Sequence, residues 1–156
     1  NQLHQFSDSP SDFERLDESY DPIYESDINL STIVTLAGLS NSDRSVESRA
    51  KSYLHANCAH CHQPGGTEQV DMDLRFETPL ENMNICNVSA STFLNDGAST
   101  KRIEPGNADN SVLLQRINSV GDIQMPPLSK SVVDQNAVDL IKIWIDSLSC
   151  SEVSAS

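Results

Sequence analysis

Residues 52–66 read SYLHANCAHCHQPGG, and this stretch limits what the chain can be more than any other. Cys58 and Cys61 lie three positions apart, and His62 follows at once. Three kinds of site use such a pattern: a thiol redox pair, half of a zinc site, and the attachment point of a haem. The rest of the sequence discriminates between them.

Two of these interpretations lack the sequence context that they need. A thioredoxin-like Cys-x-x-Cys occurs in a βαβ setting, and the sequence suggests no such alternation of strands and helices. A structural zinc site needs four ligands, commonly in two pairs, whereas Cys86 and Cys150 stand far apart. Cys-x-x-Cys-His is the signature of c-type haem attachment. We therefore expect one covalent haem c on Cys58 and Cys61, with His62 as its proximal iron ligand.

Helical periodicity appears in three segments around this motif. They run over about residues 43–57, 109–118 and 134–148. Ser42 or Asp43 is the expected N-cap of the first segment. Trp144 lies on the apolar face of the last segment, where it is expected to pack against the first. No convincing run of alternating strands is visible. The expected fold class is therefore all-α.

The composition suggests a small core and an acidic surface. Apolar residues make up 37% of the chain and aromatic residues only 5%, so a rigid apolar cofactor would help to fill the core. The net charge is −13, which makes nucleic acid and anionic membrane lipid improbable partners. No apolar run is long enough to span a bilayer. The acidity is explained either by solubility or by electrostatic steering toward a basic partner.

The charge is concentrated near the start of the chain. Residues 1–28 carry eight acidic residues against Arg15 alone, which is more than half of the net charge. We expect an acidic arm or linker over residues 1–35, a domain over residues 36–150, and a serine-rich tail over residues 151–156. Because the chain begins with asparagine rather than methionine, it is expected to be a mature or excised fragment.

Four stretches resemble a bacterial family of class I-like c-type cytochrome domains: RAKSYLHANCAHCHQPGG (49–66), DLRFETPL (73–80), RIEPGNADNSVLLQRI (102–117) and MPPLSKSVVDQNAVDLIKIWIDSL (125–148). The resemblance covers about residues 36–148. It implies a helical fold wrapped around one haem and a one-electron carrier with no reaction of its own. Such domains often serve, or are fused to, exported oxidoreductases and other secreted enzymes. The expected location is therefore periplasmic or extracellular. The chain is expected to be a monomer whose partner is a redox protein, and electrostatic steering would require that this partner be basic.

Met125 is the expected second axial ligand of the iron. Pro126 and Pro127 follow it, which favours an extended Met125 and a stiff loop that loses little entropy on ligation. The family resemblance places its ligand methionine at the same position. Met72 and Met83 lie in polar sequence and are expected to be packing or surface residues.

Histidines are the rival axial ligands. His60 lies inside the anchored motif, His55 lies on the entering helix and is expected to be solvated, and His4 lies in the acidic arm. Bis-histidine ligation stays open as an alternative. So does an open distal site, which would make the chain a haem enzyme or a ligand sensor. The remaining alternative is a zinc-stapled interaction domain.

Cationic side chains are needed to hold the two haem propionates. Arg75, Arg102 and Arg116 are the candidates, with Lys101 behind them. We favour Arg102 and Arg116, because they flank the segment that leads to Met125. Each of these residues would otherwise form ordinary surface salt bridges.

The two remaining cysteines are expected to form a disulfide. Haem attachment of this kind occurs in exported proteins, where the compartment is oxidising, so we predict a bond between Cys86 and Cys150. The loop that it closes has about 65 residues, for which the chain-entropy model gives roughly 4 kcal/mol. Two buried free thiols are the alternative.

Overall fold

The computed structural model describes residues 34–68, 70–94, 97, 99–128 and 130–150. The chain divides into two units, Asn1–Thr35 and Leu36–Ser156, and every element below belongs to the second unit. The expected acidic arm, apart from residues 34 and 35, and the expected serine-rich tail lie outside the described residues.

Helix α2 (Val46–Asn57) carries the chain into the cysteine motif. Its N-cap is Ser45, whose hydroxyl accepts a hydrogen bond from the amide of Ser48 at 3.1 Å, so the helix begins later than expected. Ala50 and Leu54 are fully buried on its inner face.

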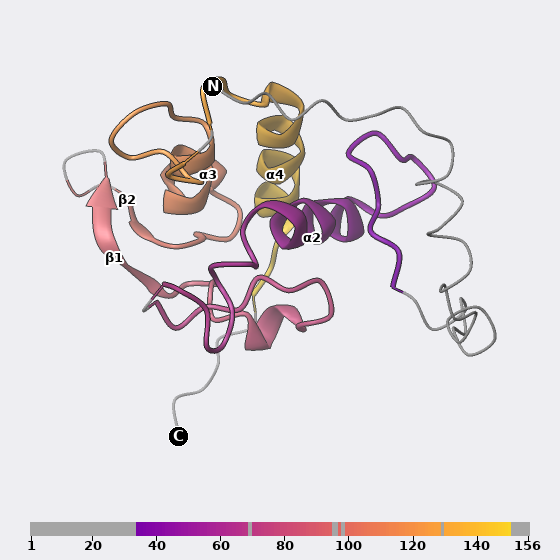
Figure 1. The fold of residues 1–156 in the computed structure, drawn as a ribbon, viewed down its shortest axis with the longest axis horizontal. Coiled ribbons are helices and arrows are strands. Elements are labelled where there is room, and N and C mark those ends of the chain that lie inside the picture. The colour runs from indigo at the N-terminus through magenta and orange to yellow at the C-terminus, as the bar shows by residue number, and fades with distance from the viewer. Residues whose placement is uncertain (1–33, 69, 95–96, 98, 129, 151–156) are drawn as a thin grey trace, which may run out of the picture. The chain divides into compact units, whose positions relative to one another are not determined.

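Helix α4 (Gln135–Ser147) begins at Asp134, whose carboxylate accepts a hydrogen bond from the amide of Ala137 at 3.1 Å. Trp144 is 1% exposed and lies in the same core cluster as Leu54 of α2. The two helices pack against each other and cross rather than run side by side (Figure 1). No helix in the described part of the chain is both long and apolar enough to cross a membrane.

Helix α3 (Val112–Ile117) is shorter than the single helix expected here, because the chain breaks at Ser111. A 3-10 turn, η5 (Ala108–Asn110), precedes the break. The buried hydroxyl of Ser111 accepts a hydrogen bond from the amide of Glu104 at 2.9 Å and donates one to the carbonyl of Asn107 at 3.1 Å. A serine hydroxyl that bonds nearby backbone in this way competes with helical hydrogen bonding.

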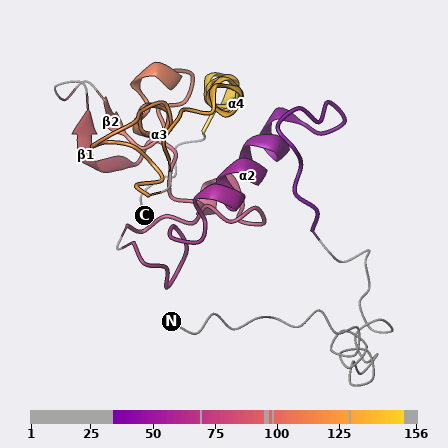
Figure 2. The same cartoon turned by 45° about the horizontal axis from the view of Figure 1, so that its top comes forward.

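The all-α prediction is wrong, since the fold is mixed α/β. Strand β1 (Ser89–Leu94) pairs with strand β2 (Ser99–Lys101) in an antiparallel two-stranded sheet. The register places Ser89 opposite Lys101 and Leu94 opposite Ser99, with an irregularity between them. The sheet lies beside α3 (Figure 2).

The sheet was missed because its buried side is small. Ala90 and Leu94 of β1 pack with Val112 of α3 in a cluster separate from the main core. The rest of β1 is mostly serine and threonine, which gives little hydrophobic alternation to detect. The sequence Asn-Asp-Gly that follows β1 is a hairpin signal that would have indicated it.

The segment between α2 and β1 contains only a short 3-10 turn, η3 (Leu80–Asn82), within the described residues. Buried side chains hold this irregular segment to the helices, namely Leu74, Met83 and Ile85 of the main core. These three side chains are almost completely withdrawn from water, and their burial stabilises the irregular chain that carries them.

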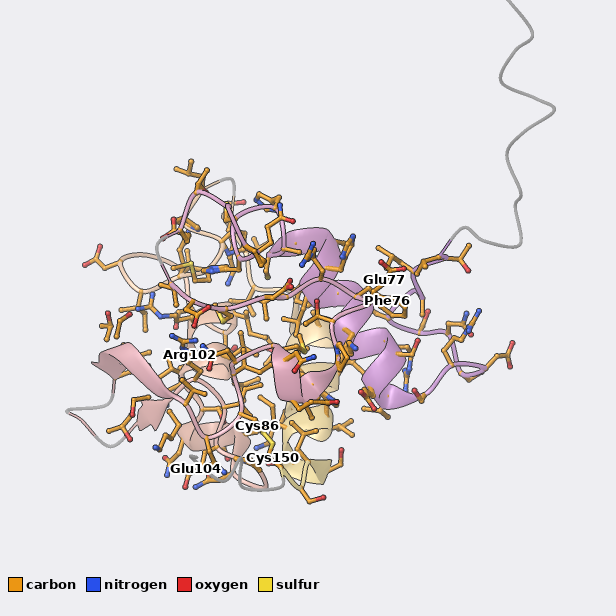
Figure 3. The ribbon with its side chains drawn as sticks, turned by 90° about the horizontal axis from the view of Figure 1, so that it is seen from below. Phe76, Glu77, Cys86, Arg102, Glu104 and Cys150 are labelled. Carbon is orange, nitrogen blue, oxygen red and sulfur yellow. A yellow bond between two sulfur atoms is a disulfide. The ribbon has the colours of Figure 1, made fainter. Side chains whose placement is uncertain are left out.

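The predicted disulfide between Cys86 and Cys150 is confirmed (Figure 3). The two Cα atoms are 6.3 Å apart, and the two residues are 64 positions apart in the sequence. Cys150 follows α4 closely, and Cys86 pairs with Ile103 through an isolated β-bridge. The bond therefore ties the end of the last helix to the segment that leads into the sheet.

Candidate functional site

The cysteine motif winds back on the end of α2. Cys58 is the C-cap of the helix, and its amide donates a hydrogen bond to the carbonyl of Leu54 at 2.9 Å. The carbonyl of Cys58 in turn accepts from the amides of Cys61 at 3.1 Å and His62 at 2.9 Å. Both thiols are free, with Cys58 buried and Cys61 partly buried. The motif is thus a compact turn that brings two sulfur atoms and an imidazole together.

The thiol of Cys58 has the wrong acidity for a redox pair. Burial, with a smaller contribution from Cys61, raises its pKa to about 12. Reactive cysteines have a lowered pKa, because the thiolate is the nucleophile. This environment disfavours a thioredoxin-like function for the pair.

His62 carries a buried nitrogen that the described residues leave without a partner. Its Nδ1 is buried and has no hydrogen bond within the described part of the chain. Burial lowers the pKa of the imidazole, and the charges of Arg102 and Arg116 act in the same direction. A neutral imidazole is the form that binds metal. The backbone of His62 is held in place, since its carbonyl accepts a hydrogen bond from the amide of Leu74 at 2.9 Å.

Two cavities meet at the motif. One has a volume of about 270 Å³ and a mainly apolar lining, and the other has a volume of about 390 Å³. Three residues line both of them: Cys58, His62 and Met125. A cysteine, the imidazole and a thioether from distant parts of the sequence therefore share one space.

Met125 reaches this space from the loop between α3 and α4. Its amide donates a hydrogen bond to the carbonyl of Arg116, at the end of α3, at 3.1 Å. The peptide bond between Met125 and Pro126 is cis. The structure thus brings Met125 to the same two cavities as His62.

Met72 is a second methionine of the site, whereas the polar sequence around it predicts only a packing or surface residue. It lines the smaller cavity together with Val70 and Leu74, whereas Met83 is fully buried in the main core. Residues 70, 72 and 74 alternate with Asp71 and Asp73 in the stretch VDMDL. That period of two indicates an extended segment with residues 70, 72 and 74 on one apolar side.

The other histidines differ in their surroundings. His55 was expected to be solvated, but its Nδ1 accepts a hydrogen bond from the amide of Phe76 at 3.0 Å. His60 is exposed and lines the larger cavity next to Cys61. His4 lies outside the described residues. Neither cavity lining includes His55.

Arg102 and Arg116 both line the smaller cavity, as candidates for the propionates should. Nη1 of Arg102 donates to the carbonyls of Asp71 at 2.5 Å and Asn84 at 2.7 Å, which fixes one corner of the guanidinium. Burial lowers the pKa of Arg102. Nη1 of Arg116 lies 3.4 Å from the carbonyl of Ile123.

The two other cationic candidates lie elsewhere. Arg75 pairs with Asp73 at 2.6 Å, and it does not line either cavity of the site. Lys101 lines a separate cavity next to the disulfide. The candidate cations that line the site are therefore Arg102 and Arg116. One further cation lies next to the site, at a residue that no motif indicated.

That residue is Lys130. Its ammonium donates hydrogen bonds to the carbonyls of Ile117 at 2.5 Å, Met125 at 3.2 Å and Arg116 at 3.4 Å. Burial lowers its pKa. A lysine that bonds only backbone carbonyls leaves no sequence signal, because a residue of any type can supply the carbonyl.

The donor set fits a haem better than a zinc ion. No group of three or more His, Cys, Asp or Glu side chains that could hold a metal occurs among the described residues. A haem needs instead two cysteines on one turn, an imidazole, an apolar wall and a second soft or imidazole ligand. The site has all of these, and the unpartnered Nδ1 of His62 belongs to the imidazole in question.

Residues 58–129, just under half of the chain, match a family model described as planctomycete cytochrome C. The matched segment begins at Cys58 and includes Met125. The match supports a cytochrome c-like domain that binds haem and transfers electrons. Searches of curated proteins and of solved structures found no match.

Proposed function

We propose that this chain is a one-electron carrier with one haem c attached to Cys58 and Cys61 and with His62 and Met125 as axial ligands. The observation that carries the proposal is that Cys58, His62 and Met125 line both cavities. A haem held there would supply a reversible one-electron couple, and a histidine–methionine ligand pair raises its potential.

The chain's own residues have separable tasks. The two cysteines would tether the haem, and burial, which lowers the pKa of His62, favours the neutral imidazole that an iron ligand must be. Met125 completes the ligand set and leaves no position for a substrate, which favours electron transfer over catalysis. The apolar wall around Leu74 and Val112 excludes water from the same space.

Arg102 and Arg116 are the proposed partners of the propionates. Both line the smaller cavity, and both lower the pKa of His62 through their charge. Arg102 is already held by two carbonyls, so it would meet an anion with little further loss of side-chain entropy. A charge-assisted hydrogen bond to a carboxylate is among the stronger polar contacts in proteins.

The proposed setting is an exported monomer that is tethered to, or works with, an exported oxidoreductase. C-type haem attachment and the disulfide both suit an oxidising compartment. The net charge of −13 favours a basic redox partner. Such encounters bury little surface, below roughly 1,200 Å².

The attachment is tested by mass spectrometry of the chain produced with the c-type haem maturation machinery, after acid–acetone extraction. The haem should stay on the chain, one per molecule. Cys58→Ala together with Cys61→Ala should abolish the retention, whereas Cys86→Ser together with Cys150→Ser should not. Haem released from the wild-type chain would contradict the proposal.

The absence of a free distal position is tested with carbon monoxide. The reduced protein should keep its spectrum when the gas is added, because both axial positions are taken. A shifted Soret band would instead indicate an open distal site and a haem enzyme or sensor.

A further inference from the structure

Lys130 lies next to the site, through its contact with Met125, and the proposed function does not yet use it. Its side chain is half-buried, and its ammonium has three donors, the same number as the carbonyls that it contacts. The contacts are selective in position. Two of the carbonyls, from Arg116 and Ile117, belong to the end of α3, and the third belongs to Met125 itself.

The end of α3 is a favourable place for this ammonium. The last carbonyls of a helix lack partners further along the helix. A cation at that end also complements the helix dipole. Lys130 therefore has a strong reason to stay at α3, and whatever else it binds is held there with it.

The Met125 loop (residues 121–128) has further hydrogen bonds of two kinds. Gln124 organises the loop internally, since its amide group bonds the backbone of Gly121 at 2.8 Å and of Pro127 at 3.2 Å. The loop is joined to α3 by the amide of Met125, which bonds Arg116 at 3.1 Å, and by Arg116, which bonds Ile123 at 3.4 Å. Lys130 adds a contact to the carbonyl of Met125, so that both the amide and the carbonyl of Met125 are bonded.

Resting on the proposed ligation by His62 and Met125, we propose that Lys130 is the positioning residue of the axial methionine. Its ammonium ties the carbonyl of Met125 to the end of α3, so the residue is held at both its amide and its carbonyl. Removal of this tie frees the methionine to leave the iron more easily. Lys130 is not a ligand and does not need to contact the haem.

The test measures how easily a small external ligand displaces the methionine. Ferric protein is titrated with imidazole while the far-red charge-transfer band of a methionine-ligated haem is followed. Lys130→Met keeps the length of the side chain and removes the ammonium, and Lys130→Gln keeps a shorter neutral donor. Lys142→Met is the matched control, because Lys142 pairs with Asp109 at 2.7 Å on the exposed side of α4.

The expected result is a dissociation constant for imidazole about tenfold lower in Lys130→Met than in the wild type. A hydrogen bond to a charged group accounts for a factor of that size. Lys130→Gln should fall between the two, Lys130→Arg should restore most of the wild-type value, and Lys142→Met should match the wild type. Thermal unfolding of each variant separates a general loss of stability from a specific loss of ligation.

Two outcomes would overturn the inference in different ways. An unchanged imidazole constant in both Lys130→Met and Lys130→Gln, with the wild-type far-red band intact, would exclude the positioning role and leave the proposed ligation standing. A wild-type protein without that band would exclude the methionine ligand itself, and with it any need to position Met125.

Discussion

The guanidinium of Arg75 forms a bidentate pair with the carboxylate of Asp73, in which Nε lies 2.9 Å from Oδ1 and Nη2 lies 2.6 Å from Oδ2. Leu74 lies between the two residues of this pair and lines the smaller cavity. Its amide donates a hydrogen bond to the carbonyl of His62, which connects the pair to the site. The hydrogen bonds from Arg75 lower the pKa of Asp73 to about 2. The acid stability of the site therefore depends on a residue that does not touch the cavity.

The fold should lose stability in acid over a defined window. Because the folded pKa of Asp73 is below its ordinary value of 3.8, the pair stabilises the fold above about pH 4, and this contribution is lost as the pH falls toward about 2. Arg75 is half exposed, so solvent screening keeps this effect small. Urea unfolding should show that Asp73→Asn is less stable than the wild type at pH 6. Its free energy of unfolding should also vary less with pH between about 4 and 2. Asp43→Asn, an exposed carboxylate, is the control and should keep the wild-type pH dependence.

The three methionines should respond differently to truncation. Met125→Ala should abolish the far-red band and let carbon monoxide bind the reduced haem. Met83→Ala should keep both properties and lose about 2–5 kcal/mol of stability, because Met83 is fully buried in the core. Met72→Ala should enlarge the smaller cavity and leave the band in place. Loss of the band in Met72→Ala alone would move the ligand assignment to that residue.

Gly66 should be sensitive to the smallest addition. A Cβ at this position would overlap the carbonyl of Cys61 and lie 2.9 Å from that of Gln63. The first atom belongs to the cysteine motif and the second to the backbone just after it, so Gly66→Ala must displace that turn. We expect a loss of about 1–3 kcal/mol in urea unfolding and a lower ratio of haem to protein absorbance. Gly38→Ala, where a Cβ meets no atom within 4 Å, should leave both measurements unchanged.

Electron exchange with a basic partner should slow as salt is added. At physiological ionic strength, charges are screened beyond about 8 Å, so the slope reports acidic groups near the encounter. Stopped-flow measurements from low to high salt give the dependence of the electron-exchange rate on salt concentration. Deletion of residues 1–28, which hold more than half of the net charge, separates the contribution of this segment from that of the rest of the chain. A slope that survives the deletion assigns the steering to the remaining domain. A flat slope in the intact chain would reduce the acidity to a matter of solubility.

Local periodicity and capping were the most reliable guides from the sequence to the helices. Asp134 and the apolar positions after it predicted α4 to within one residue at each end. The start of α2 was missed by a few residues, because several candidate caps stand in the run SNSDRS and only contacts select Ser45. The sheet was missed because serine and threonine dominate β1.

The site was predictable as far as residue chemistry extends. The residues expected to bind the haem indeed lie around common cavities, although their roles stay predictions. Met72 and Lys130 were missed for opposite reasons. Met72 had a signal, the alternation in VDMDL, whereas Lys130 acts on carbonyls that any residue could supply.

The disulfide also decides how the domain carries a mechanical load. A pull applied beyond Cys150 passes through the sulfur atoms to Cys86 and continues toward Leu36, because the covalent path bypasses everything between the two cysteines. Residues 87–149 lie outside this covalent path, and Met125, Lys130 and helix α4 are among them. The turn that holds Cys58 and His62 lies on the loaded side. Tension on the chain would therefore strain the turn that holds Cys58 and His62 first, while the bond to Cys86 shields Met125.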